Sequence, residues 1–309
     1  MDIKQYLNTW ASDYKHELQK NIMPFWLEHG LDRQHGGVYT CLDREGRLMD
    51  TTKSVWFQGR FGFIAAYAYN QVEKNPDWLA ASKSCVDFIE QHCIDTDGHM
   101  FFEVTGDGQP LRKRRYVFSE CFAAIAMSEY SIASGDTTYA LKALDMFKNI
   151  QKFLSTPGFL EPKYLPTLQS RGHSITMILI NTASRIRAAI ADPILDKQID
   201  ESLSAIRHYF MHPEFKAVLE MVGPNGEFMD TCNGRLINPG HCIETSWFIM
   251  EEAKYRNWDK NLVQMALEIL EWSWEWGWDK EYGGIINFRD CRNFPVQDYS
   301  QDMKFWWPQ

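Results

Sequence analysis

A histidine and a glutamate lie in the first turns of a helix that the sequence predicts after residue 238. Asn238, Pro239 and Gly240 lead from a polar loop into an apolar run, and Glu244 follows His241 by three residues. Residues three apart face the same side of a helix, so both side chains are expected on one face. A neutral imidazole there suits proton abstraction, with the carboxylate orienting the ring or holding a substrate hydroxyl.

The same residues also have a purely structural interpretation. Asn238 is a favourable N-cap, Pro239 suits the first helical position, and Glu244 complements the positive end of the helix dipole. This interpretation leaves His241 unexplained, because a helix N-terminus disfavours a protonated imidazole. From these residues alone, a structural and a catalytic role for His241 are equally supported.

Arg60 is a second candidate, one turn into an apolar helix that starts with Val55, Trp56 and Phe57. Gly59 before it allows close backbone approach. An arginine in such a helix is more often paired with a carboxylate. In a pocket it can instead stabilise an enolate oxygen.

Trp306 and Trp307 are candidates for a wall of the same pocket, together with Lys304. Adjacent tryptophans at the start of a helix point to different faces, so both cannot be buried in one layer. One that faces a pocket offers a flat, apolar platform of the kind that stacks on a sugar ring. Ordinary aromatic core is the alternative.

Three further residues are secondary candidates for substrate binding. Glu120 begins a helix, although Ser119 beside it is a plausible cap. His173 lies four residues before Met177 on the same face. A lone histidine is more often a satisfied wall residue than a base, so its role stays open.

The composition limits the class of protein. With 45% apolar and 14% aromatic residues, the 309-residue chain can bury a large core, which excludes disorder. A net charge of -9 argues against a nucleic-acid partner. Seven cysteines without a CxxC pair indicate reduced thiols rather than disulfides or a zinc site. Since neither a signal peptide nor an apolar run near 18 residues occurs, we expect a cytoplasmic protein outside membranes.

Helical periodicity dominates the chain. It predicts helices at about residues 4–23, 55–72, 76–93, 117–133, 137–154, 172–191, 196–210, 241–257 and 260–276, and a tenth that begins near 303. Motifs for other chemistries are absent: the sequence contains no GxGxxG after a strand, no GxxxxGK[ST], no HExxH and no GxSxG.

Strand-like pieces between pairs of helices recur with a fixed period. Their anchors are spaced by 62, 60, about 60 and about 65 residues, at Gly36, Gly98, Gly158, about Val218, and Gly283. Such a period predicts a stacked unit made of a helix pair and a short hairpin. The first, second and fourth pieces carry REG, GDG and PNG, which suit tight turns with positive φ.

Repeated helix pairs form either an open solenoid or a closed α/α toroid. The candidate side chains fall at the starts of alternate helices, which line the inner wall of a closed ring with their N-termini at one mouth. Helix N-termini favour anions and oxyanions, so a pocket is favoured over an extended groove. Five anchors imply five repeats in one domain over residues 1–309, with a sixth missing at the C-terminal end.

Several segments together resemble the N-acylglucosamine 2-epimerase family, also known as the renin-binding protein family. They follow the family's order and spacing along the whole chain: FWLEHGLDRQHGGVYTCLDREGRL, VWFQGR, VFSECFAAIAMSE, NPGHCIETSWF, GWDKEYGGIINFRD and MKFWWPQ. The resemblance implies an all-α (α/α)6 barrel with short β-hairpins at one end, with about five of six repeats present.

The resemblance also implies an isomerase of carbohydrate metabolism that interconverts N-acetylglucosamine and N-acetylmannosamine. It implies no metal and no redox cofactor, and it allows ATP as an allosteric activator rather than a substrate. The implied partner is a small amino sugar rather than nucleic acid or a membrane. Since family members are often dimers, a homodimer is one expectation.

The family mechanism removes and returns a proton at C2 of the open-chain sugar, and two histidines serve the two faces. By motif, His241 matches one of these histidines, Arg60 the arginine near O1 and O2, and Glu244 the adjacent carboxylate. Trp306 and Trp307 match the substrate wall.

Two departures from the family pattern concern the C-terminal side. The family continues past WWPQ to a glutamate two residues on and to a later segment with the second histidine, whereas this sequence ends at Gln309. The expectation is therefore a truncated chain with little or no turnover. A smaller departure is Thr176, where the family often has proline.

Rival functions remain open at this point. Within the fold they are an aldose–ketose isomerase and a cellobiose-type 2-epimerase, whose members carry an extra histidine about where Met177 lies. His173 is one turn too early for that histidine, which weakly favours the acylglucosamine branch. Outside catalysis, the rival is a non-catalytic sugar- or protein-binding barrel.

Overall fold

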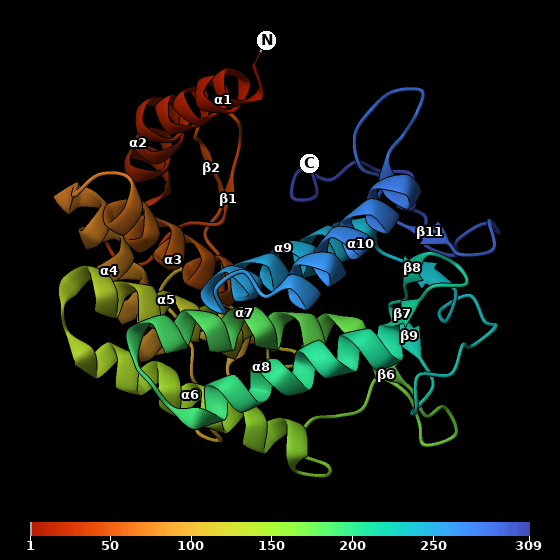
Figure 1. The fold of residues 1–309 in the computed structure, drawn as a ribbon. Coiled ribbons are helices and arrows are strands. Elements are labelled where there is room, and N and C mark those ends of the chain that lie inside the picture. The colour runs from red at the N-terminus through yellow and green to blue at the C-terminus, as the bar shows by residue number, and fades with distance from the viewer. Residues whose placement is uncertain (1) are drawn as a thin grey trace. The chain divides into compact units, whose positions relative to one another are not determined.

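The computed structural model describes residues 2–309, which fall into two compact units. Unit 1 comprises Met1–Glu161 and Arg185–Ala191, and unit 2 comprises Pro162–Ser184 and Asp192–Gln309. Both are built mainly of helices, with short strands between them (Figure 1). The single domain over residues 1–309 stays a prediction.

The helices follow the predicted periodicity. In unit 1 they are α1 (Ile3–Glu17), η1 (Leu18–Ile22), α2 (Met23–Phe25), η2 (Trp26–Gly30), α3 (Val55–Gln71), α4 (Pro76–His92), α5 (Phe118–Ser134) and α6 (Thr137–Ser155). In unit 2 they are α7 (His173–Ala189), whose last residues belong to unit 1, α8 (Pro193–Ala205), η3 (Ile206–Phe210), α9 (Pro239–Tyr255) and α10 (Lys260–Gly277). The nine helices expected before residue 280 are confirmed, and the first continues to Gly30.

Local capping explains where many of these helices begin. The N-cap side chain accepts a backbone N–H of the first turn in α4, α6, α8, α9 and α10, from Asn75, Asp136, Asp192, Asn238 and Asp259 respectively. Proline occupies the first turn of three of these helices, α4, α8 and α9. A backbone N–H at that position would have no partner within the helix, so proline costs no hydrogen bond there. By contrast, α3 starts directly after a strand and has no side-chain cap.

The strands are short antiparallel pairs. In unit 1, β1 (Cys41–Leu42) pairs with β2 (Leu48–Asp50), and β4 (Phe101–Val104) pairs with β3 (Lys53–Ser54) and β5 (Pro110–Lys113). In unit 2, β6 (Arg171–Gly172) pairs with β9 (Met221–Val222), β7 (Met211–His212) with β8 (Ala217–Val218), and β10 (Leu236–Ile237) with β11 (Arg289–Asp290).

The predicted REG, GDG and PNG turns are confirmed. Gly46, Gly108 and Gly226 have φ of 85°, 90° and 87°, and each donates its N–H to the carbonyl three residues earlier. An aromatic ring near the end of the preceding helix lies against each glycine: His29, His92 and Tyr209 respectively. The repeat seen in the sequence is therefore a repeat of backbone conformation and of packing.

Two sequence expectations are wrong. The piece around Gly158 forms turns rather than a strand. Residues 303–309 form no helix, because their polar groups bind the preceding loop instead. The Met303 carbonyl accepts the Asn287 N–H at 3.0 Å, and the Gln309 side chain bonds both backbone groups of Ile285 at 2.8 and 2.9 Å.

A buried ion pair anchors the first repeat. Lys53 is fully buried, and its ammonium donates to Asp32 Oδ2 and to the carbonyls of Gly36 and Gly106 at 2.7, 2.7 and 2.8 Å. All three ammonium protons are thus used. Burial alone would raise the pKa of Asp32, but the hydrogen bond from Lys53 holds it below its usual value.

A turn with an aspartate–lysine ion pair recurs in both units. A tight turn is closed by the bridges Leu31–Val38, Ile94–Met100 and Trp278–Ile285. The aspartate at the head of each turn binds a lysine further along the chain: Asp32 with Lys53, Asp95 with Lys113 at 2.6 Å, and Asp279 with Lys304 at 2.7 Å. Three of the repeats are therefore tied to a segment further along the chain.

We predict that Gly108→Ala destabilises the protein more than Gly135→Ala. Both glycines have positive φ, which costs an alanine about 1–2 kcal/mol. Only at Gly108 would the new Cβ overlap a ring, that of His92, whereas nothing lies within 4 Å at Gly135. Overpacking adds about 1–3 kcal/mol. Urea unfolding measures both variants, and equal costs would contradict the packing of His92 on this turn.

We also predict that Lys53→Met lowers the free energy of unfolding by about 3–5 kcal/mol, because it leaves Asp32 charged and buried without its partner. The double variant Lys53→Met/Asp32→Asn keeps the turn and removes that charge, so it should recover part of the loss. Urea unfolding of both variants is the measurement. A double variant less stable than Lys53→Met would contradict this account of the ion pair.

Candidate functional site

The start of α9 has the cap that the sequence predicts. Asn238 Oδ1 accepts the His241 N–H at 3.1 Å, and Pro239 occupies the first turn. The cap places the imidazole in the first turn of the helix, with 28% of the His241 side chain exposed. His241 is therefore held at a helix N-terminus but remains accessible.

A carboxylate from outside the helix binds the ring of His241. Glu220 lies between β8 and β9, and both of its carboxylate oxygens are 3.1 Å from His241 Nδ1. Its backbone is fixed on both sides: the N–H donates to the Leu236 carbonyl, and the carbonyl accepts the His173 N–H, each at 3.0 Å. The sequence prediction overlooked this residue.

His173 contacts the same carboxylate from the start of α7. Its Nδ1 lies 3.3 Å from Glu220 Oε1, and its Nε2 lies 3.1 Å from Thr245 Oγ1. The side chain is fully buried. The substrate-binding role predicted for His173 stays untested, and with both ring nitrogens on protein groups it reaches a ligand only through Glu220.

The electrostatics of this cluster favour an ionised carboxylate. Burial alone would raise the pKa of Glu220, but the charge of His241 and the hydrogen bonds from both histidines hold it well below its usual value. Glu220 is therefore an acceptor for both imidazoles.

An aromatic ring lies beside His241. The ring centres of His241 and Trp307 are 5.6 Å apart, at an interplanar angle of 38°. Gly240 permits this approach, because an added Cβ would lie 2.5 Å from Trp307 Cη2. Trp306 is 74% exposed and Trp307 36% exposed, so the two tryptophans do differ in their surroundings, as adjacent residues should.

The other predicted residues of unit 2 have varied surroundings. Met177 is buried. Glu244 is half-buried on α9. The ammonium of Lys304 forms an ion pair with Asp279, at the head of the turn that the Trp278–Ile285 bridge closes. Their predicted contacts with substrate stay predictions.

Unit 1 contains Arg60 and Glu120. The Arg60 guanidinium lies 4.3 Å from the ring centre of Phe122. Glu120 is buried, and one oxygen accepts hydrogen bonds from His99 Nδ1 at 2.5 Å and from the Met100 N–H at 2.6 Å. Its immediate partner in unit 1 is thus His99, which the sequence analysis did not single out.

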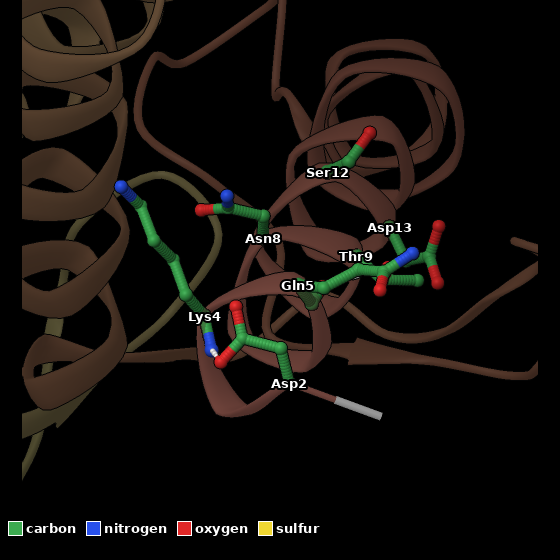
Figure 2. Close-up of a pocket in the computed structure, with 7 residues that line it drawn as sticks. All are labelled: Asp2, Lys4, Gln5, Asn8, Thr9, Ser12 and Asp13. Atoms are coloured by element: carbon green, nitrogen blue, oxygen red, sulfur yellow. Dashed lines mark hydrogen bonds between the residues drawn. The ribbon is translucent and has the colours of Figure 1, made fainter.

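Among the described residues 2–309, no group of three or more His, Cys, Asp or Glu side chains is arranged to hold a metal ion. In the same part of the chain no helix is long and apolar enough to cross a bilayer. An open surface pocket lies on α1 (Figure 2), and its lining comes from that helix and its cap alone: Asp2, Lys4, Gln5, Asn8, Thr9, Ser12 and Asp13. Because one exposed helix cannot enclose a ligand, we place the candidate site at His241.

Comparison with known proteins identifies the family. The profile described as N-acylglucosamine 2-epimerase (GlcNAc 2-epimerase) matches residues 37–309. The chain belongs to the N-acylglucosamine 2-epimerase family. The N-acylglucosamine 2-epimerase of Homo sapiens is 31% identical over 314 residues, which are 99% of this chain and 73% of the human protein. That of Bos taurus is 30% identical over 322 residues, 99% of this chain and 74% of the bovine protein.

Solved structures confirm the fold class. The cellobiose 2-epimerase of Bacillus thermoamylovorans aligns with a TM-score of 0.80 at 19% identity, over 92% of this chain and 76% of that one. A D-mannose isomerase aligns with a TM-score of 0.77 at 16% identity, over 97% and 78% of the two chains. The helix hairpins of this epimerase-family chain are therefore those of the (α/α)6 barrel class, as expected.

We predict that the pKa of His99 is raised above its usual value. Burial would lower its pKa, but the hydrogen bond and charge of Glu120 raise it above 6.5. The stability that this proton contributes is complete below the unfolded-state pKa and is lost as the pH rises through the higher folded pKa. By NMR, the His99 titration midpoint should lie above 6.5 and fall in Glu120→Gln.

The matched control for His99 is Glu129→Gln, which changes another buried carboxylate on α5 that is bound to Asn70 instead. This variant should leave the His99 midpoint unchanged. A native midpoint at or below 6.5 would overturn the assignment of His99 and Glu120 as an ion pair.

Proposed function

We propose that this protein is a sugar epimerase that inverts C2 of an N-acylated hexosamine, interconverting N-acetylglucosamine and N-acetylmannosamine. The observation that carries the proposal is the accessible imidazole of His241, bound through Nδ1 to Glu220 and lying beside Trp307. Similarity to mammalian N-acylglucosamine 2-epimerases over 99% of the chain supports the choice of substrate.

The reaction needs only proton transfer. In the open-chain sugar, the aldehyde acidifies the C2 proton, and a base that removes it leaves an enolate whose charge is on the carbonyl oxygen. Return of a proton to the opposite face of C2 inverts the centre. No electrons are exchanged with another molecule, so the proposal needs no redox cofactor.

We assign proton transfer at one face of C2 to Nε2 of His241, since Nδ1 faces Glu220. Trp307 offers a flat, apolar ring beside that imidazole, which suits the carbon face of a sugar. The role expected for Arg60 from the family resemblance, at the enolate oxygen, stays a prediction, as does that of Glu244 as the adjacent carboxylate. We also propose allosteric activation by ATP, dimer formation and a cytoplasmic location.

An aldose–ketose isomerase is the second candidate function, because it shares the enolate chemistry and because a D-mannose isomerase shares the fold. Incubation in D2O separates the two. An acylhexosamine epimerase introduces deuterium at C2 of N-acetylmannosamine, and an isomerase introduces it in mannose. Exchange in mannose alone would overturn the first assignment, and binding of either sugar without exchange would favour a non-catalytic barrel.

We predict that His241→Asn lowers the rate of C2 exchange about 10²–10⁴-fold, because it removes the base. Proton NMR of N-acetylmannosamine in D2O measures the exchange, and circular dichroism checks the fold. His208→Asn is the matched control: His208 is exposed in unit 2, and its Nδ1 contacts Ser204, four residues earlier. Retained exchange in His241→Asn would rule out this histidine as the base.

A further inference from the structure

Four residues, His241 included, form a closed ring of contacts in unit 2. It runs from His241 Nδ1 to Glu220 (3.1 Å), from Glu220 to His173 Nδ1 (3.3 Å) and from His173 Nε2 to Thr245 Oγ1 (3.1 Å). It closes where Thr245 Oγ1 lies 2.8 Å from the carbonyl of His241 itself. The ring thus joins the starts of α7 and α9 to the β8–β9 segment.

We infer that Glu220 and His173 are positioning residues that hold neutral His241 in the tautomer with its proton on Nδ1. The consequence for rate rests on the proposed epimerase function, whereas the tautomer itself does not. In this arrangement the lone pair of His241 is on Nε2, the nitrogen assigned to the substrate.

The count of hydrogen-bond donors carries the inference. An ionised carboxylate can only accept hydrogen bonds, so each histidine nitrogen that faces Glu220 must carry a hydrogen. Burial disfavours the ionised carboxylate, but the hydrogen bonds from both histidine rings, which remain when His241 is neutral, favour it. Both Nδ1 atoms are therefore donors, which in a neutral imidazole leaves Nε2 as the acceptor.

Thr245 contacts His173 Nε2, and the position of the His173 Nδ1 proton is the same whichever way the Thr245 hydroxyl hydrogen points. If the hydroxyl donates to the His241 carbonyl, His173 Nε2 must donate to Thr245 and His173 is charged. If it donates to His173 Nε2, His173 is neutral. In both cases His173 Nδ1–H stays on Glu220 and keeps the carboxylate from turning away from His241.

The carboxylate also assists the chemical step. When the C2 proton arrives at Nε2, His241 becomes an imidazolium whose Nδ1–H already faces a negative charge. The same logic operates in Ser-His-Asp triads, where the aspartate orients the imidazole and stabilises its charged form. His241 Nδ1 faces both carboxylate oxygens, so an amide in place of Glu220 would set one NH2 donor against that Nδ1–H and would also remove the negative charge.

The experiment combines a tautomer measurement with kinetics. Long-range 1H–15N NMR of protein labelled in the histidine rings reports which nitrogen carries the proton, and His241→Asn assigns the signal. We expect native neutral His241 to be protonated on Nδ1. In Glu220→Gln this signature should be lost, and kcat for N-acetylmannosamine should fall about 100-fold or more with little change in KM.

A milder variant guards against misfolding of Glu220→Gln. Thr245→Val removes the hydroxyl that contacts His173 but keeps a side chain of similar size. It should lower kcat about tenfold and partly populate the tautomer of His241 with its proton on Nε2. Ser246→Ala is the matched control, because Ser246 is a neighbouring buried hydroxyl that donates to the Ala266 carbonyl. It should leave the tautomer and kcat unchanged.

The outcomes separate the two claims. A native His241 protonated on Nε2, or unchanged tautomer and kcat in both Glu220→Gln and Thr245→Val, would overturn the inference. An Nδ1 tautomer that is lost in Glu220→Gln would support the positioning even in a native protein without C2 exchange, because the tautomer is measured independently of turnover.

Discussion

The pairing of a turn aspartate with a lysine from a following segment is the interaction on which the repeats depend. A buried ammonium is costly unless each of its protons finds an acceptor, and Lys53 meets that condition with Asp32 and two carbonyls. Its position then fixes the start of α3, which begins two residues later. The other two pairs are Asp95 with Lys113, which precedes α5, and Asp279 with Lys304, which precedes the Trp307 ring beside His241.

Much of the fold could be predicted because its determinants are local. Caps such as Asn75 and Asn238 mark helix starts, and turn glycines such as Gly46 and Gly108 repeat with the period of the hairpins. The wrong predictions concern segments whose conformation depends on contacts with residues distant in the sequence. Residues 303–309 have a helical pattern, but Met303 and the residues after it bond the loop around Ile285 and Asn287 instead.

The candidate site shows the same division. His241 and its cap are adjacent in sequence and were predictable, as was an aromatic wall containing Trp307. Glu220 was missed because its partners are 21 and 47 residues away, and only the fold brings them together. One signal existed: a single acidic residue in the apolar run AVLEMV, 217–222, where an unpaired charge is unfavourable.

The position of Glu220 also explains why a base can be placed at the start of a helix. The positive end of the α9 helix dipole disfavours an imidazolium at His241, while the carboxylate of Glu220 favours it. A base that accepts a proton and then gives it back needs neither form to be strongly preferred. Glu220 contributes its charge from the segment between β8 and β9, where His173 and the Leu236 carbonyl hold it, so the two opposing effects are set by separate elements.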